Sequence, residues 1–302
     1  MAARVSERAH ERGSRQLGTL GSGNHFLEVQ EVQEVFHPDA AKAFGLAPGQ
    51  VVIMLHTGSR GLGHQVATDY IQRFDELRLA QGTTLIDRQL SCARADSAEA
   101  RAYLEGMAAA ANFAWANRQV ITHGIRSAFE TVFGAPWRDL GLDVAYDISH
   151  NMAKIESHAT PEGDRRLLVH RKGATRAFPA GRPEVPEPYR PFGQPVLIPG
   201  DMGTASYVLS GLSSSLARSF GSSCHGAGRR MSRHAAVRAF RFDQVTRELG
   251  ERGIRVRSAS REGVTEEAPG AYKDVEEVVR AAEGAGLTRR VARLRPIGVV
   301  KG

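Results

Sequence analysis

Apolar runs that end at a histidine beside glycine or asparagine are the feature that most constrains how this chain folds. Two examples are VVIML before His56 and the segment 142–149 before His150. A strand end holds a side chain rigidly, while the adjoining loop leaves room for a ligand. Each histidine could instead be satisfied separately by a backbone carbonyl. Because the setting recurs four times, we predict one shared site containing His25, His56, His150 and His225.

The remaining elements indicate an α+β fold, because strand-like and helix-like runs mix without a regular strand–helix–strand alternation. Five prolines between residues 181 and 195 predict an irregular connection there. The other predicted elements are a strand after the glycines of GSGNHF, strands at 51–55 and 142–149, a short strand in LLVHRKGATRAFP, mostly helix over 96–134, and helices from about Gln65 to Leu79 and from about Arg229 to Leu249.

The composition is that of a soluble globular protein with a basic surface. The formal net charge is +7 and the isoelectric point is near 9.8, which favours a polyanionic partner without identifying one. Two cysteines, Cys92 and Cys224, predict no disulfide framework. No apolar run reaches the ~20 residues that span a bilayer, and the charged N-terminal stretch lacks the apolar core of a signal peptide. We therefore expect a cytoplasmic protein with no membrane partner.

Glycine-rich loops suggest phosphate binding. TGSRGLG and PGDMGT could offer consecutive backbone N–H groups to an anion, and HGAGR could do so at the start of a helix. Arg60 and Arg229 each lie four residues after a histidine and could bind a phosphate through the guanidinium fork. The alternatives are ordinary turns and solvated surface charges. No compact metal motif such as HExxH is present, so a metal centre would have to be assembled from distant segments.

Nine ordered blocks make the sequence resemble the RtcB family of RNA ligases from about Gly18 to Gly302. They are GSGNHFLEV, HTGSRGLGH, ANFAWANRQVI, DISHNMAKIE, VHRKGATRAF, PGDMGTASYVL, CHGAGRRMSR, EEAPGAYKDV and PIGVVKG. The resemblance implies one RtcB-like catalytic domain over residues 18–302, with residues 1–17 as an extension or frayed segment. It also implies a ligase that uses GTP and Mn(II) to join RNA 3′-phosphate or 2′,3′-cyclic phosphate ends to 5′-hydroxyl ends, in tRNA splicing or RNA repair. An archease-type activator is left open as a further partner.

The resemblance also assigns roles to residues. It implies that His225 is the nucleophile that becomes guanylylated, that His25, His56 and His150 bind metal, and that Arg60 and Arg229 hold RNA phosphates. Glu28 and Lys301 are expected to read the guanine edge. The implied GMP-binding positions are Asn24, His25, Phe26, Leu27, Glu28, His150, Asn151, Pro199, Gly200, Asp201, Met202, Ser206, His225, Gly226, Ala227, Gly228 and Lys301.

The sequence departs from the family in two places. The family's N-terminal Asp-x-x-Cys metal motif has no counterpart here, so the chain is expected to be N-terminally truncated, with weakened metal sites. Asp201 stands where the family usually has serine. Two other functions therefore stay open beside ligation. One is a non-catalytic GTP- or RNA-binding fragment that needs a separate N-terminal segment, and the other is a metal-dependent phosphohydrolase.

Overall fold

The computed structural model describes residues 2–302 and divides into two compact units. The helical unit comprises the residues up to Gly21 together with Thr57–Leu142, and the sheet unit comprises Ser22–His56 together with Asp143–Gly302. No helix within residues 2–302 is long and apolar enough to cross a membrane. Helices and largely antiparallel strands mix as predicted, so the α+β class is confirmed.

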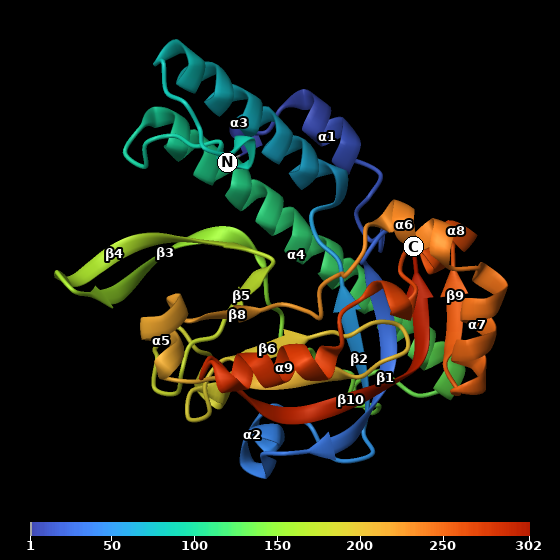
Figure 1. Ribbon diagram of the computed structural model, residues 1–302. Coiled ribbons are helices and arrows are strands. Elements are labelled where there is room, and N and C mark those ends of the chain that lie inside the picture. Colours follow the sequence, from blue (N-terminus) through green and yellow to red (C-terminus); the bar gives the residue numbers. More distant parts are fainter. Residues whose placement is uncertain (1) are drawn as a thin grey trace. The chain divides into compact units, whose positions relative to one another are not determined.

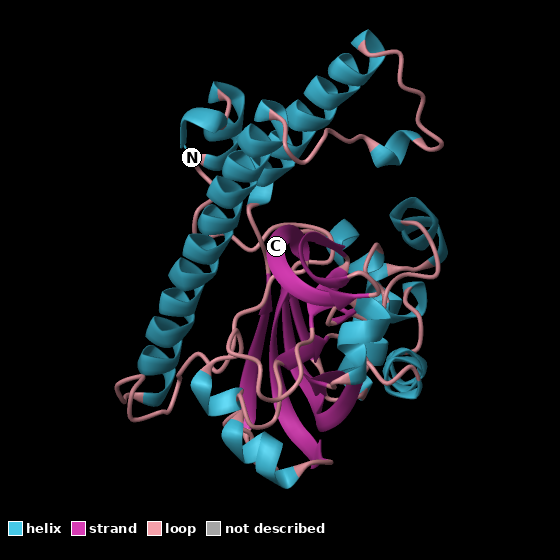
Figure 2. Cartoon of the chain, turned by 90° about the vertical axis from the view of Figure 1, so that its left-hand side faces the viewer, coloured by secondary structure: helices cyan, strands magenta, loops and turns pink. Residues whose placement is uncertain are grey.

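The helical unit is built on two long helices, which Figure 2 shows as extended cyan coils. Ser97 caps the longer one by accepting a hydrogen bond from the backbone N–H of Ala100, and Gly134 ends it in a left-handed conformation. The predicted helices at 65–79 and 96–134 are confirmed, the first beginning earlier than expected. The helices of this unit are η1 (Ala2–Arg4), α1 (Glu7–Gly13), α3 (Arg60–Ala80), η2 (Arg88–Leu90) and α4 (Ala98–Phe133).

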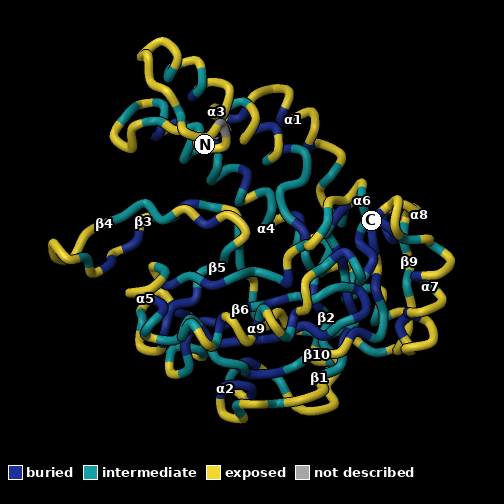
Figure 3. Tube along the Cα trace, viewed as in Figure 1, coloured by how far each residue is buried: buried dark blue, intermediate teal, exposed yellow. Residues whose placement is uncertain are grey.

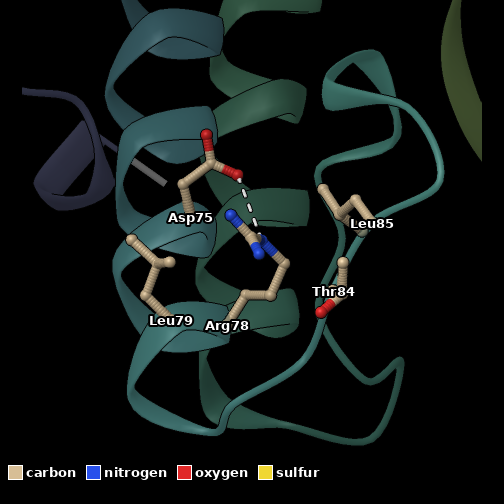
Figure 4. Close-up of a pocket in the computed structure, with 5 residues that line it drawn as sticks. All are labelled: Asp75, Arg78, Leu79, Thr84 and Leu85. Atoms are coloured by element: carbon tan, nitrogen blue, oxygen red, sulfur yellow. Dashed lines mark ion pairs between the residues drawn. The ribbon is translucent and has the colours of Figure 1, made fainter.

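Apolar side chains from α1, α3 and α4 form the core of the helical unit. Ala9 of α1 packs with Leu62 and Val66 of α3 and with Ala110 of α4. A surface hollow of about 470 Å³ near the end of α3 is lined by Asp75, Arg78, Leu79, Thr84 and Leu85 (Figure 4). None of the predicted site residues lines this hollow.

The sheet unit is organised around its longest strand, β10, which occupies the middle of a six-stranded sheet (Figure 1). The order is β2-β1-β10-β7-β6, with β9 pairing in parallel to the end of β10. Two further antiparallel pairs, β3–β4 and β5–β8, stand outside this sheet. The strands are β1 (Phe26–Val35), β2 (Val51–His56), β3 (Asn151–Thr160), β4 (Gly163–Lys172), β5 (Ala174–Arg176), β6 (Pro195–Ile198), β7 (Ser206–Gly211), β8 (Ser222–Cys224), β9 (Arg255–Ser258) and β10 (Thr288–Lys301).

Buried positions run along the central strands of the sheet unit, as Figure 3 marks in dark blue. Val208 of β7 packs with Val291 and Leu294 of β10 in one cluster, and Leu209 packs with Val196 in another. The helices of the unit are α2 (Pro38–Ala43), η3 (Glu187–Tyr189), α5 (Ser214–Ser219), α6 (Arg233–Ala239), α7 (Phe242–Glu251), α8 (Arg261–Thr265), η4 (Pro269–Ala271) and α9 (Val275–Gly284).

Two predicted elements are wrong. Residues 142–149 form no strand, and the strand instead begins after His150, at Asn151. Side chains far along the chain bind the polar groups of that segment, because the Ala145 carbonyl accepts a hydrogen bond from the Tyr189 hydroxyl and the Tyr146 hydroxyl accepts one from Gln194. Its apolar residues therefore do not need a strand partner.

The helix predicted over 229–249 is also wrong, because it is two helices. Arg229 forms a β-bridge with Tyr272, and α6 begins only at Arg233, after the capping residue Ser232. Phe240 then adopts an extended conformation, with φ −117° and ψ 144°, which separates α6 from α7. Residues 233–249 contain no glycine or proline, so the sequence carries no helix-breaking signal at this break.

Candidate active site

The four predicted histidines lie together in the sheet unit. The Nε2 atoms of His56 and His150 are 3.0 Å apart. The rings of His150 and His225 are stacked, with centroids 4.2 Å apart, and the centroids of His25 and His56 are 6.0 Å apart. Antiparallel pairing of β1 with β2 sets Phe26 opposite His56, which brings His25 to the same end of the sheet. The structure therefore brings the four histidines together, and their action as one functional site stays a prediction.

A single hydrogen bond fixes the protonation of the His225 ring. Its Nδ1 lies 2.7 Å from the carbonyl oxygen of Gly173. A carbonyl can only accept, so Nδ1 carries the proton and Nε2 keeps a free lone pair. Burial lowers the pKa of His225, and the hydrogen bond to Gly173 opposes this only in part. The ring is therefore a neutral imidazole, and its unprotonated Nε2 can act as a nucleophile or as a metal ligand.

Gly173 supplies this carbonyl from the sharp junction between β4 and β5. Its φ is +64°, in the left-handed region that glycine tolerates best, and a Cβ there would lie 3.4 Å from Cε1 of His225. The Gly173 N–H donates to Oδ1 of Asn151 at 3.0 Å. Asn151, one of the predicted nucleotide-binding residues, thus holds the residue that orients His225.

The histidine cluster has a donor set that suits a divalent metal ion. Burial lowers the pKa of His56 well below its usual value, and the neighbouring His150, His25 and His225 lower it further, so His56 is neutral. Two nitrogens bound at ~2.1 Å to one ion at right angles are about 3 Å apart, which matches the His56–His150 separation. Within residues 2–302, however, no group of three or more histidine, cysteine, aspartate or glutamate side chains is arranged to hold a metal. The fit is that of a partial ligand set.

Glu28 lies in a buried polar row on the inward face of β1. Gln30 donates from Nε2 to Glu28 at 2.7 Å and to the Ser206 hydroxyl at 3.0 Å. Burial raises the pKa of Glu28 to about 8, and the nearby charge of Asp201 adds to this. Gln30 was not predicted as a site residue, because β1 carries several Glu and Gln side chains and only the fold shows which of them are buried.

Lys301 reaches the same region from the end of β10. Its ammonium group donates to the Gly23 carbonyl at 2.6 Å, and burial lowers its pKa. Because Leu27 pairs with Val300, Lys301 lies at the same end of the sheet as Glu28, and its charge lowers the pKa of that carboxyl. The role of Glu28 and Lys301 in reading a base stays a prediction.

In the loop at Pro199–Thr204, backbone N–H groups that were expected to face an anion bond instead to side chains of the loop and to Ser206. Asp201 accepts the Gly203 N–H at 2.8 Å, the Asp201 N–H donates to the Thr204 hydroxyl at 3.1 Å, and the Gly200 N–H points to Ser206 Oγ at 3.4 Å. Burial raises the pKa of the Asp201 carboxyl, and its hydrogen bonds from Gly203 and Thr204 oppose this. These amides are already paired, so they do not form the open anion cradle that the glycines suggested.

Gly226, Ala227 and Gly228 form an irregular segment with a bend at Gly226, rather than a helix start. The Ala227 N–H donates to the Pro199 carbonyl at 3.0 Å, which joins this segment to the loop that ends in Thr204. Gly228 adopts a left-handed φ of +74°. The segment after His225 and the loop at Pro199–Thr204 are thereby joined beside the histidine cluster.

The two predicted phosphate-binding arginines lie in different settings. Arg229 donates to Glu267 at 3.0 Å, to the Glu266 carbonyl at 2.6 Å and to the Met231 carbonyl at 3.1 Å, so most of its donors bind protein groups. Arg60 belongs to the helical unit, has a positive φ of 51°, and donates to the Thr19 hydroxyl. A role in phosphate binding stays a prediction for both.

Comparison with known proteins identifies relatives over the whole chain. A family model described as "tRNA-splicing ligase RtcB" matches residues 1–302. Proteins named tRNA-splicing ligase RtcB from Thermococcus kodakarensis, Pyrococcus horikoshii and Aeropyrum pernix are 56%, 55% and 53% identical over 99%, 99% and 100% of this chain. The chain spans 62% of the Thermococcus and Aeropyrum relatives and 34% of the Pyrococcus relative. The ordered sequence blocks, the histidine cluster and these matches together place the chain in the RtcB family.

Proposed function

We propose that the sheet unit is the guanylylation centre of an RNA ligase of tRNA splicing or RNA repair, with His225 as the nucleophile. The observation that carries the proposal is the hydrogen bond from His225 Nδ1 to the Gly173 carbonyl. It leaves Nε2 unprotonated and holds the ring in one orientation, which are the two requirements for an attacking imidazole. The names of the relatives support the reaction class.

The proposed first step transfers a guanylyl group from GTP to His225. Nε2 of His225 attacks the α-phosphorus of GTP, a P–N bond forms, and the P–O bond to the β-phosphate breaks to release pyrophosphate. The ring gains positive charge in this step, and the Gly173 carbonyl stabilises it because the carbonyl already accepts the Nδ1 proton. The guanylyl group then passes to an RNA 3′-phosphate, including one derived from a 2′,3′-cyclic phosphate, and the RNA 5′-hydroxyl displaces GMP.

Mn(II) is the proposed metal, and His56 and His150 are the residues that would hold it, with His25 beside them. When bound, such an ion supplies charge neutralisation and polarisation of a phosphoryl oxygen. Imidazole nitrogen suits Mn(II) only moderately, so selection would rest on geometry and metal availability.

The proposal is tested by incubating the full chain with Mn(II) and GTP labelled at the α-phosphate, followed by denaturing electrophoresis. We expect label that stays with the chain, that is lost in acid and that survives alkali, as a phosphoramidate does. Labelled ATP is the matched control and should give little label. A chain that binds Mn(II) and GTP but acquires no label would contradict the proposal.

Glu28 is expected to make GTP binding depend on pH and to favour guanine over adenine. We propose that its carboxylate accepts hydrogen bonds from the guanine N–H edge while Lys301 donates to the guanine carbonyl. Because the pKa of Glu28 is raised to about 8, the free protein holds it mostly protonated at pH 7. Binding through the ionised form must then strengthen as pH rises from 7 toward 8, by up to about tenfold per pH unit, and level off above it.

GTP affinity measured by calorimetry across this pH range checks the prediction. Glu28→Gln should flatten the pH dependence and reduce the preference for GTP over ATP, because an amide no longer matches two adjacent donors. Glu31→Gln, in the middle of the same strand but on its opposite, less buried face, is the matched control. Retention of both the pH dependence and the preference in Glu28→Gln would refute the base-reading role.

One observation favours the second candidate function, a GTP- or RNA-binding fragment without catalysis. Within the described residues no three-ligand metal group is assembled, so this chain alone could bind nucleotide without reacting. Titration with Mn(II), followed by electron paramagnetic resonance, separates the two. Two bound ions per chain favour the enzyme, and none favours the fragment. The phosphohydrolase alternative lacks such support, because hydrolysis would need neither His225 nor Lys301.

A further inference from the structure

A buried ion pair spans the two strands of the β3–β4 hairpin. Arg171 donates from Nη1 and Nη2 to the two carboxylate oxygens of Glu156, each at 2.8 Å, and both residues are about 5% exposed. Nε2 of His158 lies 3.1 Å from the same carboxylate. Burial tends to raise the pKa of Glu156, but hydrogen bonds from Arg171 and His158 outweigh it, so the pKa is lowered and the carboxylate is ionised.

The same guanidinium also reaches the segment that precedes His225. Arg171 donates from Nε to the Ser222 hydroxyl at 2.9 Å and from Nη2 to the Phe220 carbonyl at 3.0 Å. Ser222 begins β8, and His225 follows that strand directly. Phe220 has a φ of +51°, which is strained for a non-glycine residue. The hydrogen bond from Arg171 to its carbonyl stabilises this conformation.

The backbone just after Arg171 orients the His225 ring. Gly173, two residues after Arg171, carries the carbonyl that accepts the Nδ1 proton of His225. The next residue, Ala174, pairs with Cys224 in the short β5–β8 ladder. One stretch of three residues therefore holds both the backbone before His225 and the ring itself.

The chemistry of the pair indicates a geometric role. A buried ion pair contributes little net stability compared with well-packed apolar residues, because desolvation offsets the Coulombic attraction. A guanidinium fork, in contrast, fixes several acceptors in one plane at set angles, which lysine or an apolar side chain cannot reproduce. Here the fork joins Glu156 to Ser222 and Phe220, and so joins the hairpin to the loop that leads to His225.

We propose that Arg171, held by Glu156, is a positioning residue that keeps His225 as the single tautomer and orientation able to attack GTP, an inference that rests on the proposed nucleophilic role of His225. Neither residue touches His225 directly. They act through Ser222 on its backbone and through Gly173 on its ring.

The test compares the full chain with Arg171→Lys, which keeps the positive charge beside Glu156 but loses the fork. Glu156→Gln is the second variant, and Arg166→Gln, an exposed arginine on the same strand, is the control. Histidine labelled with ¹⁵N reports by NMR which ring nitrogen of His225 carries the proton, and His225→Ala assigns the signal. The rate and the apparent KM for covalent labelling by GTP are measured on the same samples, and circular dichroism checks folding.

We expect wild type and Arg166→Gln to show one tautomer protonated at Nδ1. Arg171→Lys should show a mixture of tautomers and a labelling rate lower by about 100-fold, the effect of a small misplacement of a reacting group, with KM within about twofold. Glu156→Gln should shift both readouts in the same direction. A folded Arg171→Lys that keeps either the wild-type tautomer or the wild-type rate would overturn the inference.

The NMR readout separates failure of this inference from failure of the proposed function. If wild type acquires no label while Arg171→Lys still changes the tautomer, the nucleophile assignment fails and the structural coupling stands. If Arg171→Lys does not fold, Glu156→Gln decides, because its side chain keeps the size and shape of glutamate. An unchanged tautomer in a folded Glu156→Gln would then overturn the inference.

Discussion

His225→Ala is expected to abolish covalent labelling by GTP, with a loss of at least about 10⁴-fold. Removal of the nucleophile of a covalent mechanism removes the only atom that forms the intermediate, and triad knockouts elsewhere give losses of this size. Binding of Mn(II) and GTP should change much less, because His56, His150 and Glu28 remain in place. The measurement is the initial rate of label incorporation at saturating GTP.

His170→Ala is the matched control for this experiment. His170 is an exposed histidine on β4, the strand that leads to Gly173, and it is absent from the predicted site. It should label at the wild-type rate. If His225→Ala retained substantial label, the nucleophile would have to be another side chain. The hydrogen bond from His225 Nδ1 to the Gly173 carbonyl would then have no part in catalysis.

Asn117→Ala is expected to lower the free energy of unfolding by about 3 kcal/mol, the second large effect. The Asn117 side chain is fully buried in α4, where its oxygen accepts from the N–H groups of Gly18 and Thr19 at 2.7 and 3.1 Å. Its nitrogen donates to the carbonyls of Thr19 and Gly58 at 3.1 and 3.2 Å. Alanine would leave several of these backbone groups buried without partners, which is more costly than losing exposed hydrogen bonds.

Urea denaturation followed by circular dichroism checks this prediction. Gln119→Ala, at an exposed position two residues along the same helix, is the control and should change stability by less than about 0.5 kcal/mol. An equally small change for Asn117→Ala would mean that water replaces the side chain without cost. Because Asn117 also bonds to Thr57 and Gly58, which follow His56, its loss should disorder that loop as well.

The strands and helices with strong local patterns were predictable from the sequence. Strand β2, helix α4 and the irregular proline-rich connection follow from apolar runs, from periodicity and from residues that cannot extend a helix. The absence of a strand at 142–149 was not predictable, because that segment bonds to residues far along the chain. The break at Phe240, whose ring packs against Gly270, was not predictable either. Local propensity is a weak guide where tertiary hydrogen bonds decide the conformation.

The same division applies to the candidate site. Its histidines were predictable, because each stands beside glycine or asparagine at the edge of a strand. Gly173 and Arg171 were not, since a glycine carbonyl and a buried arginine carry no signal until the fold sets them against His225 and Ser222. Gln30 is visible in the sequence as a polar residue of a strand, but its burial and its bond to Ser206 become evident only from the fold.

The central position of β10 has a consequence for how the protein is made. Leu27, near the start of β1, pairs with Val300, so the sheet closes through a contact between residues 273 positions apart in sequence. Such distant pairings form slowly, because the entropy of closing a long loop is lost before the strand contacts stabilise the sheet. A ribosome therefore has to release almost the whole of this sequence before Lys301 can reach Gly23. During synthesis, the emerging polypeptide holds His25 and Glu28 without their final neighbours, so the proposed nucleotide site can form only after nearly all of this sequence has been translated.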